Sequence, residues 1–395
     1  MLHIFIITFP GYFIYHYLVS MDWMPAFLAG YSTAICLLSL PWLIAVHLRF
    51  KINNPVPTDP VEKVLFVFIA YYALTTTWQL STRNMLNSSE AHPTVIAQFL
   101  ALYFLGHHTP CEPRKRLVLI TLVAIMSAMI LHNSMTGGLI GAALESVGVS
   151  ESLITYQGYA FAYFVTLTWT VASLHRRGTL RVFVYLLAFV ALFLNGARSE
   201  FAAALISFLM LEFLVAKSKA RALQWALFAI LLFAAVYLVF EDELQDYRVI
   251  TIFTDYSEDL SVLDRKKMRE DGINTILAHP LTGRFGSYLG GEYIHSYLSA
   301  WVDLGAVGFA LFLVLSALPG IYLWTQRHHL TADHELQLLF MLTSSTLLLS
   351  LTAKPFTQYL LPLTLGVCVR HVHAKQLWRD IASHSSTTRP QEMST

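Results

Sequence analysis

Charged side chains are scarce in this sequence: they make up 13% of its 395 residues, against about 25% in an average soluble domain. Hydrophobic residues make up 56%, and the mean hydropathy is +0.55. Water cannot be the main solvent of a surface with so little charge, so we predict an all-α, polytopic membrane protein. The formal net charge of only +1 argues against a basic nucleic-acid-binding surface, and no nucleic acid is expected among the partners.

Cysteine is also scarce, with Cys36, Cys111 and Cys368 as the full set. None of them lies in the long polar segment 241–295, which excludes a disulfide framework there. The first apolar segment, residues 2–20, lacks a basic n-region and a small-residue cleavage site. We therefore expect it to be a retained first span and not a signal peptide.

Long apolar runs are plentiful, and about 20 apolar residues suffice to cross the hydrocarbon of a bilayer. We predict about 12 transmembrane helices, with ten or eleven as the alternative because two segments are short. The predicted spans are residues 2–20, 24–48, 61–80, 91–106, 117–135, 152–174, 180–195, 199–216, 222–240, 296–324, 335–353 and 355–372.

The basic residues divide unequally between the two sides of these spans. If the N-terminus is cytoplasmic, the cytoplasmic segments hold 17 Lys and Arg residues, and the short outer turns hold only Arg83, Arg198 and Lys354. Cytoplasmic loops carry such an excess of cations. The bias predicts a bacterial inner-membrane protein with both termini cytoplasmic and one large periplasmic loop, 241–295, between spans 9 and 10. The polar residues 381–395 are expected to form a disordered cytoplasmic tail.

The predicted loop carries an unusual basic cluster, and a long loop is often functional. Residues 264–277 have the pattern of an amphipathic helix on which Arg265 and Arg269, at i and i+4, share one face. Two guanidinium groups on one face can bind a phosphate or pyrophosphate. The alternative is a solvated helix with local ion pairs. The expected apolar stripe is Met268, Ile273, Ile276 and Leu277, and the local acidic partners would be Asp264, Glu270 and Asp271.

Two further positions are candidates for function. A glycine-rich stretch that contains Arg284 follows the predicted helix, and the chain re-enters the membrane at His295. A partly desolvated imidazole there can act as a base, although a histidine at an interface can also be plain packing. Arg198 lies in a tight outer turn, where a charge is costly and often functional. Its alternatives are an ion pair with Glu200 or contact with a lipid headgroup.

Three stretches of the sequence together resemble the O-antigen ligase and polymerase superfamily. They are NGARSEFAAAL around Arg198, DRKKMREDGINTILAHPLTGRFGSY from Asp264, and IHSYLSAWVDLGAVGF from Ile294. Their order and their common membrane face match the family over roughly residues 190–320. Ser199-Glu200 and Ser296 depart from the pattern, because we expect smaller residues after the arginine and many members have Asn after the histidine.

The resemblance implies an inverting, metal-independent glycan transfer on the periplasmic side, within a membrane domain that spans residues 1–380. The donor would be an undecaprenyl-pyrophosphate-linked glycan. The acceptor would be lipid A-core for a ligase, or a second lipid-linked repeat for a polymerase, and both stay open. Arg198 and Arg265 would hold the pyrophosphate, with Arg269 and Arg284 as further substrate-binding residues, and His295 would position or deprotonate the acceptor hydroxyl. Membrane lipids are the other expected contact, and no cofactor or metal is expected.

A membrane transporter or flippase, moving a lipid-linked glycan or a small solute, is the alternative from a different class. It predicts charged residues paired in the middle of the membrane. Most predicted spans lack acidic or basic residues at their centres, and Glu212 and Asp303 come nearest.

Overall fold

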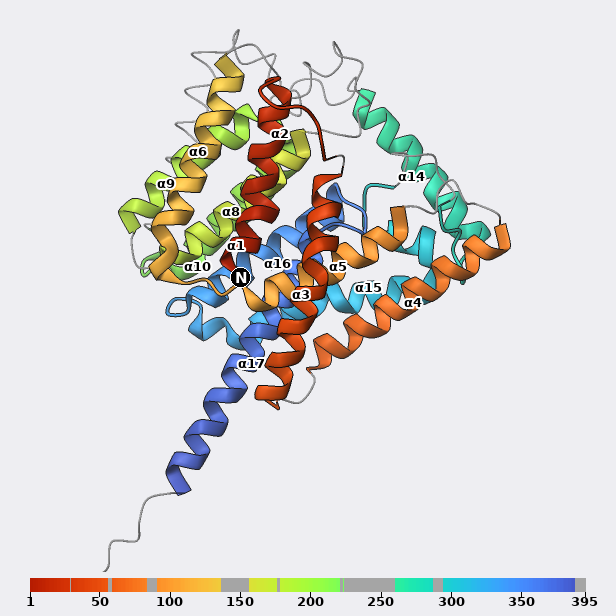
Figure 1. Ribbon diagram of the computed structural model, residues 1–395. Helices are drawn as coiled ribbons and strands as arrows, with labels where there is room; N and C mark the ends of the chain where they lie inside the picture. The colour runs from red at the N-terminus through yellow and green to blue at the C-terminus, as the bar shows by residue number, and fades with distance from the viewer. Residues whose placement is uncertain are drawn as a thin grey trace, which may run out of the picture.

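The structure is a computed structural model that describes residues 1–28, 30–55, 59–83, 91–135, 156–175, 178–220, 223, 260–286 and 294–387. Within these residues the regular elements are all helices (Figure 1), which confirms the predicted all-α class. In chain order they are α1 (Leu2–Ile6), η1 (Ile7–Gly11), α2 (Tyr12–Ser20), α3 (Tyr31–Asn53), α4 (Pro60–Arg83), α5 (Ala91–His108), η3 (Pro113–Lys115), α6 (Arg116–Met135), α8 (Tyr156–Ser173), α9 (Gly178–Leu194), α10 (Arg198–Val215), α14 (Leu260–Ala278), α15 (Ser299–Gln326), η4 (Arg327–His329), α16 (His334–Thr352) and α17 (Leu360–Thr387).

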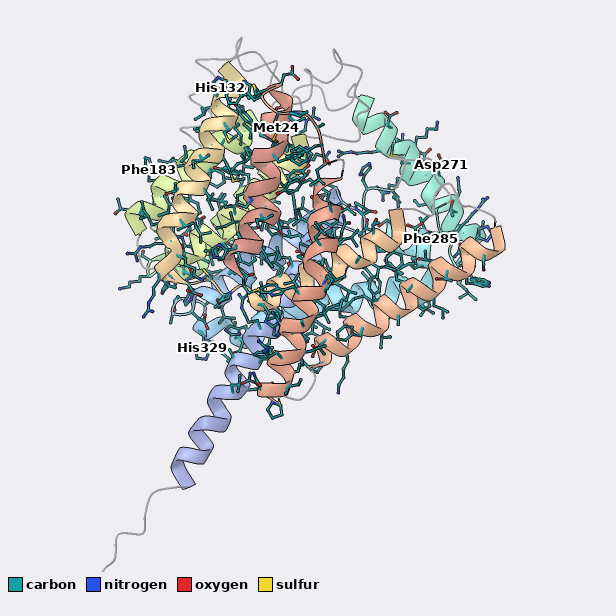
Figure 2. The ribbon with its side chains drawn as sticks, in the orientation of Figure 1. Met24, His132, Phe183, Asp271, Phe285 and His329 are labelled. Atoms are coloured by element: carbon teal, nitrogen blue, oxygen red, sulfur yellow. The ribbon has the colours of Figure 1, made fainter. Side chains whose placement is uncertain are left out.

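The chain is a multi-pass membrane protein by the length and apolar character of its helices. Five described segments are long and apolar enough to cross a bilayer: Leu2–Ser20, Tyr31–Asn53, Pro113–Ser134, Ser299–His329 and His334–Thr352. Large apolar side chains such as Leu38, Phe183 and Trp324 are mostly exposed, and Figure 2 shows Phe183 on the outside of the bundle. A soluble monomer rarely exposes such surface. The number of twelve spans stays a prediction, and the predicted span 222–240 lies outside the described residues except for residue 223.

Two helices at the centre of the bundle cross at a pair of glycines. A Cβ atom added to Gly106 of α5 would lie 2.4 Å from the carbonyl oxygen of Leu363. A Cβ atom added to Gly366 of α17 would lie 2.1 Å from the carbonyl oxygen of Tyr103. Small residues let helices approach this closely in membrane proteins, where packing drives association. The crossing brings the C-terminal end of α5 against α17.

Helix α14 is an outlying helix that packs on the start of α15 (Figure 1). Ile276 is buried with Ile294 and Val302 in a small separate core, and a Cβ atom at Gly272 would lie 3.1 Å from Cδ1 of Ile294. The predicted apolar stripe is wrong in part, because Ile273 and Leu277 are exposed. The face of α14 that packs inward contains Gly272 and Ile276, which are spaced i, i+4. Gly272 lacks a side chain and so permits the close approach of Ile294.

The glycine-rich stretch after α14 is fixed to a kink in α15. Gly305 adopts φ +68° within α15, and a Cβ atom there would lie 2.1 Å from the carbonyl oxygen of Leu281. The backbone nitrogen of Arg284 donates to the Val302 carbonyl (2.6 Å), and that of Gly286 donates to Oδ1 of Asp303 (3.2 Å). Only glycine combines this dihedral with this contact. Asp303 and Gly305 of α15 therefore have a structural role.

The last helix is longer than its predicted span. α17 continues to Thr387 and so includes the first residues of the predicted tail 381–395. A helix that has already formed extends at little cost, because each added residue gains one hydrogen bond. Residues 388–395 lie outside the described part of the chain.

Candidate active site

Arg198 is placed by a tight turn between α9 and α10. Gly196 adopts φ +74° after the last residue of α9, and its backbone nitrogen donates to the Phe193 carbonyl (3.1 Å). Such a left-handed glycine ends a helix and reverses the chain. Arg198 is then the first residue of α10 and is half-buried. A guanidinium beside the N-terminal amides of a helix is an arrangement that favours an anion.

Glu200, in the first turn of α10, is fully buried and pairs with a cation from a distant turn. Its Oε1 lies 2.8 Å from Nζ of Lys354, which follows α16. Lys354 Nζ also donates to Oε1 of Gln157 (2.9 Å), and the Ser199 hydroxyl donates to Glu200 Oε2 (2.7 Å). The ion pair that the sequence suggested between Arg198 and Glu200 is replaced by this one. Ser199 and Glu200, the two residues that depart from the family pattern, are thus part of a buried hydrogen-bond network.

We predict that Lys354→Ala lowers the free energy of unfolding by about 3–5 kcal/mol, because it leaves a buried carboxylate without its cation. Unfolding of the purified protein in mixed micelles measures the effect. Lys115→Ala is the control, since Lys115 pairs with Glu112 at 2.8 Å with both side chains about 40% exposed, where a pair contributes only about 0–1 kcal/mol. The double variant Lys354→Met/Glu200→Gln should recover most of the loss. An equal effect of the Lys354 and Lys115 changes would contradict this assignment.

His295 lies at the entrance to α15, four residues before the helix begins. Its Nδ1 is 3.3 Å from the carbonyl oxygen of Ala353, the neighbour of Lys354. Burial, and then the charges of Arg265 and Lys354, lower the pKa of His295 to about 4, although the Ala353 carbonyl acts the other way. His295 is therefore neutral near pH 7. Because a carbonyl only accepts, Nδ1 carries the proton, and Nε2 carries the lone pair that a base needs.

The basic residues of α14 are exposed, and one of them lies within electrostatic range of His295. Arg265 and Arg269 form no ion pair among the described residues. Asp264, Glu270 and Asp271, the expected local partners, therefore leave the charges of both arginines available to bind an anion. Arg265 acts on the pKa of His295. The backbone of Arg284 is held by its hydrogen bond to Val302, while its side chain is exposed.

A cavity of about 290 Å³ lies beside Lys354. It is close to the lower end of the roughly 300–1,000 Å³ of small-molecule pockets, and like them it has a mostly apolar wall with a few polar groups. Those polar groups come from helices far apart in the sequence: Tyr12, Gln98, Gln157, Lys354, Gln358 and Tyr359 are among the lining residues. The cavity can admit a small polar group next to the Glu200–Lys354 pair.

The structure places some of the candidate residues near one another. His295 lies near Arg265 and Lys354, and Arg198 lies two residues before Glu200, the partner of Lys354. The sequence analysis named Glu200 only as a possible partner of Arg198 and Lys354 only as an outer cation, so it did not predict the pair that they form. The signal for Lys354 was present, since it is one of only three cations in the predicted short outer turns, but its partner is 154 positions away in the chain.

The two acidic residues of the transporter alternative have other roles. Glu212 Oε1 lies 2.7 Å from Nε of Arg181 and accepts from the Tyr185 hydroxyl (2.6 Å). Both members of this pair lie within a turn of a helix end, Arg181 at the start of α9 and Glu212 at the end of α10. Asp303 accepts from the loop backbone. Neither arrangement is the mid-membrane charge pair that a transporter predicts.

Comparison with known proteins supports the resemblance seen in the sequence. Residues 183–313 match the family model described as O-antigen ligase. The resemblance to the O-antigen ligase and polymerase superfamily is confirmed. The matched segment begins inside α9 and ends inside α15, so it includes Arg198, Arg265, Arg269, Arg284 and His295, whereas Lys354 lies outside it. The match indicates an enzyme of ligase or polymerase type.

No curated protein matches the chain at a significant level. Among solved structures, a chain described under "Structural coordination of polymerization and crosslinking by a peptidoglycan synthase complex" is similar at 16% identity, with a TM-score of 0.45, over 80% of this chain and 99% of that chain. This score is too low to show a shared fold.

Proposed function

We propose that the protein transfers a glycan from an undecaprenyl-pyrophosphate donor to an acceptor hydroxyl at the periplasmic face of the bacterial inner membrane, with inversion and without a catalytic metal. The family match supports ligase- or polymerase-type glycan transfer. The observation that carries the finer proposal is the place of His295, with Nδ1 against the Ala353 carbonyl, where burial and the charges of Arg265 and Lys354 lower its pKa. A base and fixed cations at one site are what displacement of a pyrophosphate needs.

In the proposed reaction, the acceptor oxygen forms a bond to the anomeric carbon as the bond from that carbon to the pyrophosphate oxygen breaks. The electron pair leaves with the pyrophosphate, whose growing negative charge Arg198 and Arg265 stabilise. The hydroxyl proton goes to Nε2 of His295. Attack from the side opposite the leaving group inverts the anomeric centre. Arg269 and Arg284 are both exposed and lie between Arg265 and His295 in the chain. They would bind the outer parts of the donor.

Transfer by the purified protein in liposomes tests this proposal. The donor is an undecaprenyl-pyrophosphate-linked oligosaccharide, and the acceptor is either lipid A-core or a second lipid-linked repeat. We expect undecaprenyl pyrophosphate to be released and the glycan to appear on one of the two acceptors, which separates ligase from polymerase. Movement of intact donor across the bilayer without transfer to either acceptor would favour a flippase and contradict the proposal.

The proposed sidedness has its own test. We predict that Lys267→Cys, on exposed α14, reacts with a membrane-impermeant thiol reagent in spheroplasts, whereas Arg114→Cys, on a predicted cytoplasmic segment, reacts only after lysis. The three native cysteines are buried and provide a low background. The reverse labelling pattern would place the site on the cytoplasmic side.

A further inference from the structure

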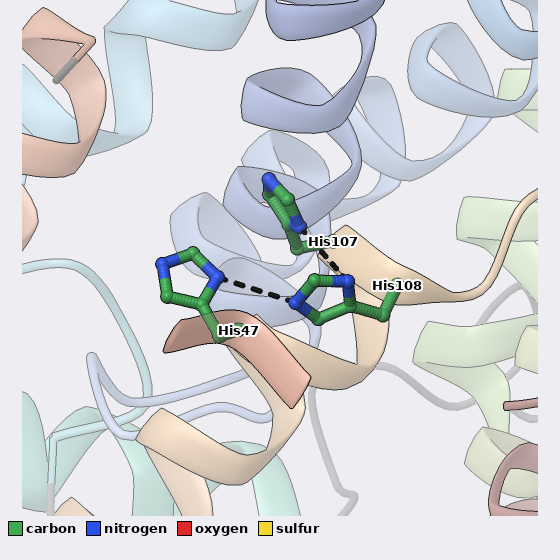
Figure 3. A group of neighbouring side chains, drawn as sticks. All are labelled: His47, His107 and His108. Carbon is green, nitrogen blue, oxygen red and sulfur yellow. Dashed lines mark hydrogen bonds between the residues drawn. The ribbon is translucent and has the colours of Figure 1, made fainter. Parts of the chain in front are cut away.

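Four histidines from three helices meet near the ends of α3 and α5. His47 Nδ1 lies 3.2 Å from Nε2 of His108, and His107 Nδ1 lies 3.4 Å from Nδ1 of His108 (Figure 3). On the far side, His107 Nε2 lies 3.2 Å from Nδ1 of His373 of α17. His47, His107 and His373 are buried, and His108 is half-buried. None of these residues belongs to the glycan-transfer site.

The spacing of these nitrogens fits a tetrahedral metal ion. Zn²⁺ binds imidazole nitrogen at about 2.0–2.1 Å, which separates two ligand atoms of a tetrahedron by about 3.3 Å. The two contacts of His108 have this separation, but they use different nitrogens of its ring. One ligand atom from each of His47, His107 and His108 lies within 4.8 Å of the others. One nitrogen of each ring can therefore face a common ion once the ring of His108 turns so that a single nitrogen serves both neighbours.

The second nitrogens of two of these rings already have partners, and that of His47 is a carboxylate, the kind of outer partner that metal ligands use. His47 Nε2 lies 3.2 Å from Oε1 of Glu62, as in a carboxylate–histidine–metal arrangement, while Nδ1 faces His108. His107 Nε2 faces His373, which leaves its Nδ1 toward His108. Such outer partners fix the ring orientation and raise the basicity of the ligand.

The nearby cations are already compensated. Lys51 Nζ lies 2.6 Å from Oε2 of Glu62. Arg370 is bonded to Glu335 and to the carbonyl oxygens of Gly106 and Thr109. Each of these cations therefore has a carboxylate partner, and a divalent cation does not meet an unpaired ammonium or guanidinium group.

We propose that His47, His107 and His108 bind one transition-metal ion, of which Zn²⁺ fits best. Glu62 and His373 are its outer partners, and water takes the fourth position. The ion joins α3 to α5, and through His373 it reaches α17. Its place at the lower end of α3 is remote from α14 at the upper right (Figure 1), so its role is to fix the bundle and not to take part in transfer.

Metal binding by the full-length protein, purified in detergent with an affinity tag that contains no histidine, tests the proposal. We expect about one Zn²⁺ per chain after desalting. Removal of one ligand by His108→Ala should weaken binding beyond the roughly 10–100-fold that loss of an outer partner costs. The control is His175→Ala/His334→Ala, a pair whose stacked rings lie 5.2 Å apart elsewhere. Equal Zn²⁺ in the wild type and His108→Ala would overturn the proposal.

If His108→Ala fails to fold, zinc X-ray absorption of the wild-type protein tests the same proposal without a variant. Three imidazole ligands are expected in a four-coordinate shell. Fewer than three, or no retained zinc at all, would mean that the cluster is a hydrogen-bonded chain of neutral histidines and not a metal site.

Discussion

Replacing His295 by alanine is expected to lower the rate of glycan transfer by about 10²–10⁴-fold, the usual contribution of a general base. The protein should stay folded, because His295 is only half-buried and its ring approaches the Ala353 carbonyl at no less than 3.3 Å. His295→Gln keeps a donor for that carbonyl but not a useful base, so it should be nearly as inactive. Transfer by each variant in liposomes, at matched protein amount, measures the effect.

His279 is the matched control for this change. It lies in the same segment, half-buried after the end of α14, and its carbonyl accepts from the backbone nitrogen of Gly283 (3.0 Å). Since these contacts use only its backbone, His279→Ala should leave transfer close to that of the wild type. If His279→Ala abolished transfer and His295→Ala did not, the other histidine would be the base.

The pH profile of transfer follows from the same environment. An ordinary histidine has a pKa of about 6.5, but that of His295 is lowered to about 4, chiefly by burial. Only the neutral form can accept a proton, and protonation becomes favourable as the pH falls below the pKa. The rate should therefore stay nearly level from about pH 8 to about pH 5 and fall only below that. A midpoint near pH 6.5 would be inconsistent with this site.

Local sequence signals predicted the parts of the molecule that depend on local physics. Apolar runs placed most of the described apolar helices within a few residues, because burial in lipid demands a continuous helix, but α3 begins later and α17 ends later than predicted. The turn before Arg198 and the helix with Arg265 were also foreseen, since glycine and the i, i+4 spacing act over a few residues. The predicted apolar stripe of α14 was wrong in part because Gly272, which has no side chain, determines which face of the helix packs inward.

The missed part of the site depends on contacts between distant segments. Glu200 and Lys354 make a buried pair, and only the packing of α10 on α16 brings them together. Likewise, His47 and His373 lie over 300 positions apart, so no spacing rule could have joined them to His107. Single-sequence patterns identify such residues only as unusual charges or as ordinary histidines.

The second large effect is expected from the arginines. Arg198→Ala and Arg265→Ala should each lower transfer about 10- to 150-fold, the kinetic equivalent of about 1.5–3 kcal/mol of charge-assisted hydrogen bonding. Lysine at either position keeps the charge but loses the two-pronged geometry, so it should restore only part of the rate. If both residues hold one pyrophosphate, the double variant should lose less than the product of the single effects, because neighbouring interactions are not additive.

The matched control for Arg265 is Lys266→Ala, which removes an exposed cation from the adjacent position on α14. Consecutive residues on a helix do not share a face, so this change should have little effect on transfer. The two changes also differ in the pH profile. The charge of Arg265 helps to hold down the pKa of His295, so Arg265→Ala should move the acid limb of the profile upward in pH, and Lys266→Ala should not. The upward shift is partial, because burial is the larger cause and remains. Equal effects of the two changes on rate and on profile would mean that Arg265 acts through overall charge and does not belong to the site.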